Sequence, residues 1–142
     1  MKIKLFEEFD YNAYNHDIKD WFVVYGLGGG MNTKHYEIVE QATQKEVEQI
    51  AWDLVVEHYQ SYAGLHGLKN WSEVEEELRE EYPNEEFDDD SIQEAYNEEI
   101  ERWAIYYAEE LDSNNKEQID NIKEEGLRLS PRIKKILNIT NE

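Results

Sequence analysis

The sequence predicts an α+β protein, in which a small antiparallel sheet of about three strands packs on one helix and an acidic helical section follows. Strand patterns occupy the beginning of the chain and helix patterns the rest, an order typical of this class. The 142 residues match the size of one domain with its own core. We therefore expect a single domain over 1–142, with strands and a first helix in 1–70, an acidic helical section in 71–112 and C-terminal helices in 113–142.

Three segments have strand character. Residues 2–6 alternate polar and apolar side chains, as a half-buried strand does. Residues 21–25, Trp-Phe-Val-Val-Tyr, are a short apolar run that predicts a central strand buried on both faces. Residues 35–41 resume the pattern after a glycine loop, so we expect segments 21–25 and 35–41 to form a hairpin.

Helix starts are indicated by a Ser or Thr with a Glu three residues later, because the two side chains satisfy free backbone N–H groups reciprocally. This capping-box pattern occurs at Thr43, Ser72 and Ser91. Gly126 predicts the end of a further helix, and Ser130-Pro131 the start of the last one. The predicted helices cover 43–62, 72–82, 91–111, 115–125 and 131–137.

Composition restricts the environment and the chemistry. An aromatic content of 13% argues for a folded core despite 34% charged residues. The absence of cysteine excludes disulfides, thiolate zinc sites and cysteine nucleophiles. The N-terminus reaches charged residues too early for a signal peptide, and no apolar run approaches the ~20 residues of a membrane span. We expect a cytoplasmic protein with no membrane partner.

Negative charge is concentrated in one stretch. Eighteen Asp or Glu residues lie between Glu73 and Asp112 against Arg79 and Arg102, so the stretch carries −16 of the formal net charge of −20. This charge repels phosphate backbones, so direct binding to nucleic acid is not expected. Basic proteins are the expected partners, although a surface kept negative only for solubility is the alternative.

The predicted helix 91–111 has two faces. Ile92, Tyr96, Ile100, Trp103, Tyr107 and Leu111 form the expected core face. The opposite stripe is acidic with one Ile in its middle, which is typical of an interface where an apolar anchor binds and charges steer. The predicted partner-binding residues are Glu76, Glu80, Glu85, Glu86, Asp88, Asp89, Asp90, Glu94, Glu98, Glu101, Ile105 and Glu109.

The glycine loop Gly26–Gly30 is the candidate ligand site. Glycines let backbone N–H groups approach a phosphate, but dinucleotide and P-loop sites place such a loop before a helix. Here the loop leads into a strand, which predicts a structural hairpin with positive φ angles. A ligand site formed by Gly28, Gly29, Gly30 and His66 is the alternative.

No pattern for metal binding or catalysis is found. The four histidines, His16, His35, His58 and His66, lack the His-x-x-x-His and Glu-x-x-His spacings, and we expect His58 to be packed on the first helix. The loop 84–90 lacks the alternating ligands and glycine of a calcium loop. We therefore expect no cofactor, no metal, no catalytic residue and no enzymatic activity.

Three segments resemble small acidic accessory proteins encoded by bacteriophages: Met1–Phe9, Trp21–Gly30 and Ser61–Leu68. The resemblance covers about the first half of the chain and supplies no catalytic residues. It implies a setting, because phages use small acidic proteins, DNA mimics among them, to block host restriction, CRISPR effectors, repair enzymes or polymerase.

Together with the acidic surface, this resemblance predicts a non-enzymatic inhibitor of anti-CRISPR or anti-restriction type. Such a protein acts in the host cytoplasm and occupies the basic nucleic-acid-binding groove of a host protein. Two alternatives are a protein that binds a small ligand or nucleotide through Gly26–Gly30, and a structural or assembly component of a virion.

Overall fold

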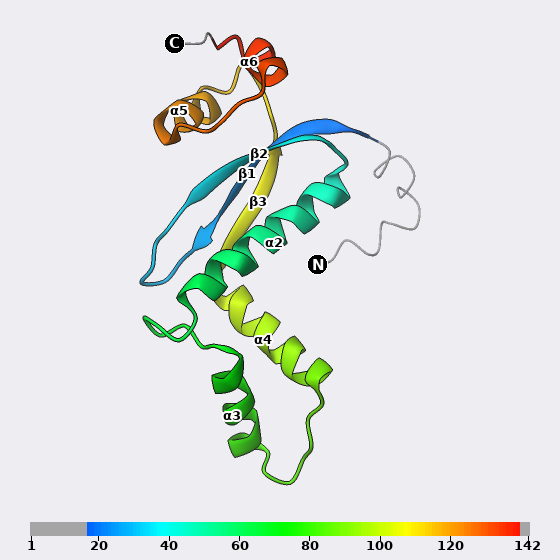
Figure 1. Cartoon of the computed structure of the whole chain (residues 1–142), viewed down its shortest axis with the longest axis vertical. Helices are drawn as coiled ribbons and strands as arrows, with labels where there is room; N and C mark the ends of the chain where they lie inside the picture. The colour runs from blue at the N-terminus through cyan, green and yellow to red at the C-terminus, as the bar shows by residue number, and fades with distance from the viewer. Residues whose placement is uncertain (1–16, 140–142) are drawn as a thin grey trace. The chain divides into compact units, whose positions relative to one another are not determined.

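A computed structural model describes residues 17–139, and within them the fold is α+β, with a three-stranded antiparallel sheet and five helices (Figure 1). The predicted strand at 2–6 lies outside the described residues. The elements are β1 (Lys19–Leu27), β2 (His35–Ala42), α2 (Gln44–Tyr62), α3 (Trp71–Glu81), α4 (Asp89–Trp103), β3 (Ala104–Glu110), α5 (Lys116–Glu125) and α6 (Pro131–Leu137).

The chain divides into two compact units, which are described separately. Among the described residues, the first unit contains 17–24, His35–Trp52 and 106–139, and the second contains Tyr25–Lys34 and Asp53–Ile105. The expectation of one domain over 1–142 stays a prediction.

The sheet has the order β2-β1-β3, so the predicted central position of β1 is confirmed (Figure 1). β1 and β2 are the two predicted hairpin strands. The Leu111 N–H donates to the Asp20 carbonyl at 2.9 Å, and the Gly28 N–H donates to the Trp103 carbonyl at 2.8 Å. Residue numbers rise along β1 as they fall along β3, which is the register of an antiparallel pair.

In the first unit β1 is buried on both faces, as the apolar run predicts. Phe22 and Val24 belong to a buried cluster with Ile122 of α5 and with Ile133 and Leu137 of α6. The coverage of this face by the two C-terminal helices was not predicted. It follows from their short apolar stripes, which are too narrow for a separate core.

In the first unit, the opposite face of the sheet contacts α2. The Trp21 indole, which points to this face because side chains alternate along a strand, donates to the Ala42 carbonyl at 2.8 Å. Trp52 of α2 lies against Tyr106 of β3, with ring centroids 5.5 Å apart. The predicted packing of the first helix on the sheet is therefore observed here.

An ion-pair cluster centred on Asp20 connects α6 to β1 and β2. The Arg132 guanidinium donates to the Asp20 carboxylate and, at 3.2 Å, to Glu40. The Gln41 N–H also donates to Asp20, at 3.0 Å. Asp20 is the least exposed member of the cluster, and its charge-assisted hydrogen bonds connect α6 to the sheet.

Two predicted helix caps are wrong. The Thr43–Glu46 capping box is confirmed, with its two hydrogen bonds at 3.1 and 2.8 Å. Asn70 caps α3 instead, and its side chain accepts from the Glu73 N–H, whereas Asp88 caps α4, and its side chain accepts from the Ser91 N–H. Asn and Asp are as good at this position as Ser. Ser72 and Ser91 therefore lie inside the first helical turns.

The predicted helix 91–111 is also wrong in its last third. The helix ends at Trp103, and Ala104 is extended, with φ −71° and ψ 135°. Ile105, Tyr106 and Tyr107 favour a strand, and pairing with β1 satisfies their backbone groups. Tyr107, expected in the core, is 45% exposed.

The hairpin between β1 and β2 depends on one glycine for steric reasons. A Cβ atom at Gly26 would lie 2.1 Å from the Thr33 carbonyl oxygen, whereas one at Gly30 would have no neighbour within 4 Å. We expect Gly26→Ala to lower the free energy of unfolding by about 1–3 kcal/mol. Gly30→Ala should leave it within about 0.5 kcal/mol of the parent or raise it. Urea unfolding followed by circular dichroism measures both, and equal losses would contradict this role.

Candidate functional site

In the second unit α3 and α4 pack against each other and form a helical hairpin with the loop 82–88 (Figure 1). We call residues 71–103 the acidic hairpin. It contains 15 Asp or Glu residues and two arginines, Arg79 and Arg102, and so carries a net charge of 15 − 2, or −13. This is the main concentration of charge in the chain.

An aromatic cluster holds the acidic hairpin together. The ring of Tyr96 on α4 lies 5.8 Å from that of Trp71 on α3 and 5.9 Å from that of Tyr59 on α2, edge to face in both pairs. Edge-to-face pairs add about 0.5–1.5 kcal/mol each beyond simple burial. Val74 of α3 and Ile92 and Ile100 of α4 are buried as well. The hairpin therefore has a packed inner side.

Each helix also carries an exposed row of carboxylates. On α4 the exposed residues Glu94, Glu98 and Glu101 follow helical spacing, which places them along one side of the helix. On α3 the exposed row is spaced three and four residues apart, and it consists of Glu73, Glu76, Glu77 and Glu80.

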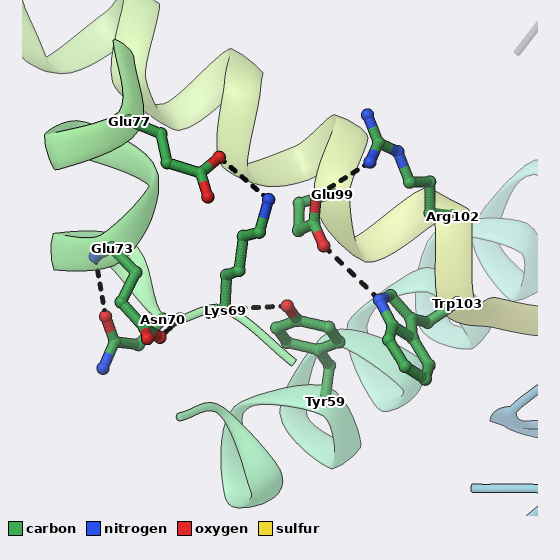
Figure 2. A network of polar contacts seen from close by, with 8 residues as sticks. All are labelled: Tyr59, Lys69, Asn70, Glu73, Glu77, Glu99, Arg102 and Trp103. Atoms are coloured by element: carbon green, nitrogen blue, oxygen red, sulfur yellow. Dashed lines mark hydrogen bonds and ion pairs between the residues drawn. The ribbon is translucent and has the colours of Figure 1, made fainter. Parts of the chain in front are cut away.

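The α3 row faces a hollow of about 420 Å³, whose other wall comes from the segment after α2, namely Gly64, Gly67, Leu68 and Lys69. Lys69 is the cation of this hollow. Its ammonium lies 2.8 Å from Glu77 Oε1, and the hydrogen bond raises the pKa of Lys69 above its usual value of 10.5 (Figure 2). Glu73 accepts from the Asn70 N–H at 2.9 Å, and Glu76 and Glu80 stay exposed.

Behind the exposed rows, Glu99 is a buried carboxylate with 8% of its surface exposed. The Trp103 indole donates to Glu99 Oε2 at 3.4 Å, and Arg102 approaches Oε1 at 3.5 Å (Figure 2). The nearby Tyr59 hydroxyl donates to the Lys69 carbonyl at 2.7 Å. Burial, with the Glu99 charge adding to it, raises the pKa of Tyr59 to about 12. Glu99 thus belongs to the framework of the hairpin.

The three aspartates at the start of α4 stabilise that helix end. Asp88 caps it, and Asp89 and Asp90 lie in the first turn, where negative charge interacts favourably with the helix dipole. The hydrogen bond from the Ser91 N–H lowers the pKa of Asp88 below its ordinary value. These predicted site residues therefore have a structural role whether or not they meet a partner.

The structure brings together only part of the predicted partner-binding set. Glu76, Glu80, Glu85, Glu86, Glu94, Glu98 and Glu101 are exposed on the acidic hairpin. The predicted helical stripe that continues to Ile105 and Glu109 is wrong, because both residues lie on β3. Ile105 is 39% exposed, and Glu109 accepts from the Gln118 amide at 3.0 Å within the first unit.

The glycine loop forms the predicted hairpin turn. Gly29 has φ +56°, and a Cβ atom there would lie 3.1 Å from the Trp103 ring. Thr33 Oγ1 accepts from the Leu27 N–H at 2.9 Å and lies 3.0 Å from His58 Nε2, so His58 is packed as expected. His66 is exposed, with its ring 6.4 Å from that of Tyr62. The close packing on Trp103 accounts for Gly29 without a ligand.

Residues 17–139 contain no group of three or more His, Cys, Asp or Glu side chains placed to hold a metal ion. None of the helices in this range is both long and apolar enough to cross a membrane.

Sequence reasoning missed several members of the site. Asn70 and Glu73 have the capping-box spacing, but the adjacent pair Ser72 and Glu75 has it too, and spacing alone does not distinguish the two pairs. No local signal marks Lys69 or Glu99, because their positions depend on the approach of α3, α4 and the end of α2 (Figure 2).

Comparisons with protein-family models, with curated protein sequences and with solved structures find no match to this chain.

The aromatic cluster makes the acidic hairpin sensitive to one side chain. We expect Tyr96→Ala to lower the free energy of unfolding by about 3–5 kcal/mol, because it leaves a cavity between Tyr59 and Trp71. Tyr82→Ala, at a 45% exposed position in the loop, is the matched control and should cost less than about 1 kcal/mol. Urea unfolding of both variants tests this, and similar losses would show that the cluster is not the anchor.

Because the pKa of Tyr59 is raised in the folded protein, we expect the free energy of unfolding to fall at alkaline pH. Below pH 10 this tyrosine is neutral in both states, and its contribution is complete. Between pH 10 and about 12 the unfolded chain ionises first, so folding should lose up to about 2–3 kcal/mol.

The control is Tyr59→Phe. It should start about 1 kcal/mol less stable, since it lacks the hydrogen bond to Lys69, and its stability should then fall less steeply in this pH range. Chemical unfolding measures the free energy of unfolding of both proteins at each pH. If it fell equally for the parent and the variant, Tyr59 would not be the group responsible.

Proposed function

We propose that this protein is a non-enzymatic binding protein whose acidic hairpin occupies a basic, nucleic-acid-binding groove of another protein. One observation carries the proposal. Two capped helices, packed on the aromatic cluster of Tyr59, Trp71 and Tyr96, present rows of exposed carboxylates. A packed support gives these charges a defined spacing, which a solvated acidic tail lacks.

The charge density of the hairpin is comparable to that of DNA. The 15 residues of α4 rise about 22 Å at 1.5 Å each, so −13 over this length is about one negative charge per 1.7 Å. B-DNA carries one negative charge per ≈ 1.7 Å of axis. A groove whose lysines and arginines contact phosphates can therefore pair with the hairpin through charge-assisted hydrogen bonds.

The concentration of charge favours a binding role over solubility alone. Like charges held on adjacent helices repel and destabilise the fold, whereas solubility requires only that net charge be far from zero. The segment after the acidic stretch, residues 113–142, has six basic and five acidic residues and is nearly neutral. The negative charge is therefore concentrated on the acidic hairpin, whose helices are packed in place.

A phage origin, which the expected resemblance to phage accessory proteins implies, would favour a particular class of partner. Restriction enzymes, CRISPR effectors, repair enzymes and polymerases all hold nucleic acid in basic grooves. A phage-encoded acidic protein that competes for such a groove would protect phage DNA or redirect host machinery. We therefore propose a host nucleic-acid-handling protein as the partner.

The α4 row provides the direct test. We expect the triple substitution Glu94→Lys, Glu98→Lys and Glu101→Lys to remove most binding, because it changes six units of charge on one helix face. The probe is the immobilised protein, which should capture nucleic-acid-binding proteins from a host lysate. Double-stranded DNA or raised salt should release them, since both compete with the same charges.

The matched control is Glu37→Lys, Glu124→Lys and Glu125→Lys, an equal charge change at three exposed residues of the first unit. Captured proteins should remain bound to this variant. Circular dichroism verifies that both variants are folded. If both variants lost binding equally, the effect would be one of net charge and not of the α4 row. If DNA failed to displace the captured proteins, competition for a nucleic-acid-binding groove would be contradicted.

A further inference from the structure

The hollow beside α3 in the second unit is negatively charged and contains one cation of its own. Four glutamates of the α3 row and Lys69 line it, so its formal net charge is −4 + 1, or −3. Gly64 and Gly67 in the opposite wall have φ angles of +92° and +89° and carry no side chains that would fill the space. The volume of about 420 Å³ therefore leaves room beside the lysine for a further side chain.

The Lys69 side chain reaches the α3 row from outside that helix. Its ammonium lies 2.8 Å from Glu77 Oε1, and the two side chains are 32% and 57% exposed (Figure 2). Water reaches both partners, and exposed ion pairs of this kind are weak. Another cation that enters the hollow can therefore compete with Lys69 for Glu77.

The walls of the hollow do not depend on this ion pair. The Tyr59 hydroxyl donates to the Lys69 carbonyl at 2.7 Å, which fixes the backbone of Lys69 and not its side chain (Figure 2). Asn70 and Glu73 form the capping box at the start of α3. The ammonium can thus leave Glu77 while the backbone on both sides of the hollow stays in place.

Two further carboxylates of the hollow are available to an incoming cation. Glu76 and Glu80 are exposed and lie one helical turn apart on α3, a spacing that places neighbouring side chains about 5–6 Å apart. Within residues 17–139 neither of them makes an ion pair. A guanidinium is planar and carries five N–H donors, so it bonds to more than one carboxylate more readily than an ammonium does.

We propose that this hollow receives an arginine side chain of the partner, and that Lys69 is an internal competitor which the arginine displaces from Glu77. The inference rests on the proposed function, because the arginine belongs to the basic groove proposed there. In the free protein Lys69 neutralises one carboxylate of the α3 row. It thereby disfavours partners that offer positive charge without a side chain able to enter the hollow.

Calorimetric titration of the full chain with a blocked hexa-arginine peptide tests the proposal. We expect Lys69→Gln to tighten binding about twofold to fivefold, because the competing ion pair is lost. Arg79→Gln is the matched control. It removes an equal charge and breaks the ion pair of Arg79 with Glu75, which lies on the same helix but does not line the hollow. It should change the affinity by less than about 1.5-fold.

Neutralising the exposed carboxylates should have the opposite effect. Glu76→Gln with Glu80→Gln should weaken peptide binding about threefold to tenfold, and Glu124→Gln with Glu125→Gln, exposed in the first unit, should weaken it less than half as much. Circular dichroism verifies the fold of each variant. Equal effects of Lys69→Gln and its control, equal effects of the two glutamate pairs, or no binding by the parent would each overturn the proposal.

NMR of the parent protein with isotope-labelled lysine needs no substitution. At saturating peptide the side-chain ammonium signal of Lys69 should shift, because its hydrogen bond to Glu77 is broken. Lys116, paired with Asp120 at 2.9 Å in the first unit, is the internal control and should not shift. An unchanged Lys69 signal would overturn the displacement. Neither peptide experiment depends on the α4 row or on capture from a lysate, so failure of this inference is distinguishable from failure of the proposed function.

Discussion

The contact of Tyr96 with Tyr59 and Trp71 is the constraint on which the second unit depends. The acidic hairpin has a net charge of −13, and mutual repulsion of its carboxylates opposes the approach of α3 to α4. Burial of Tyr59 and Tyr96, together with Ile92 and Ile100, and the contact with the partly buried Trp71 supply a short-range attraction that salt does not screen. The aromatic cluster therefore turns a run of charge into a surface with fixed geometry.

Helix caps and ion pairs reduce the repulsion among the carboxylates of the acidic hairpin without neutralising its net charge. Asp88 and Asn70 cap the two helices, so several of the charges lie at positive helix ends. Arg79 pairs with Glu75 at 2.6 Å, and Lys69 pairs with Glu77. These pairs do not involve the α4 row, whose carboxylates stay exposed.

The fold could be predicted from sequence wherever one periodicity was compatible with the residues. Three sequence patterns each predicted only one structure, and each prediction was confirmed. They are the apolar run of β1, the capping box at Thr43 and the helix end at Gly126. The segment after Trp103 was compatible with two secondary structures. Ile105 and Tyr107 fit a helical face and also a strand, and the choice was made by β1, which lies far away in the sequence and offers backbone partners. The predicted stripe with Ile105 at its centre was wrong for this reason.

The amino-acid sequence is sufficient to predict that the chain is α+β, that its charge is concentrated in one stretch, and that this stretch contains two amphipathic helices. These properties depend on composition and on spacing along a few turns. The folded chain was needed to establish which carboxylates share a helix face, that Glu99 is buried beside Trp103, and that Glu109 belongs to a strand. Those positions depend on contacts between residues distant in the chain, where packing and backbone pairing outweigh local preference.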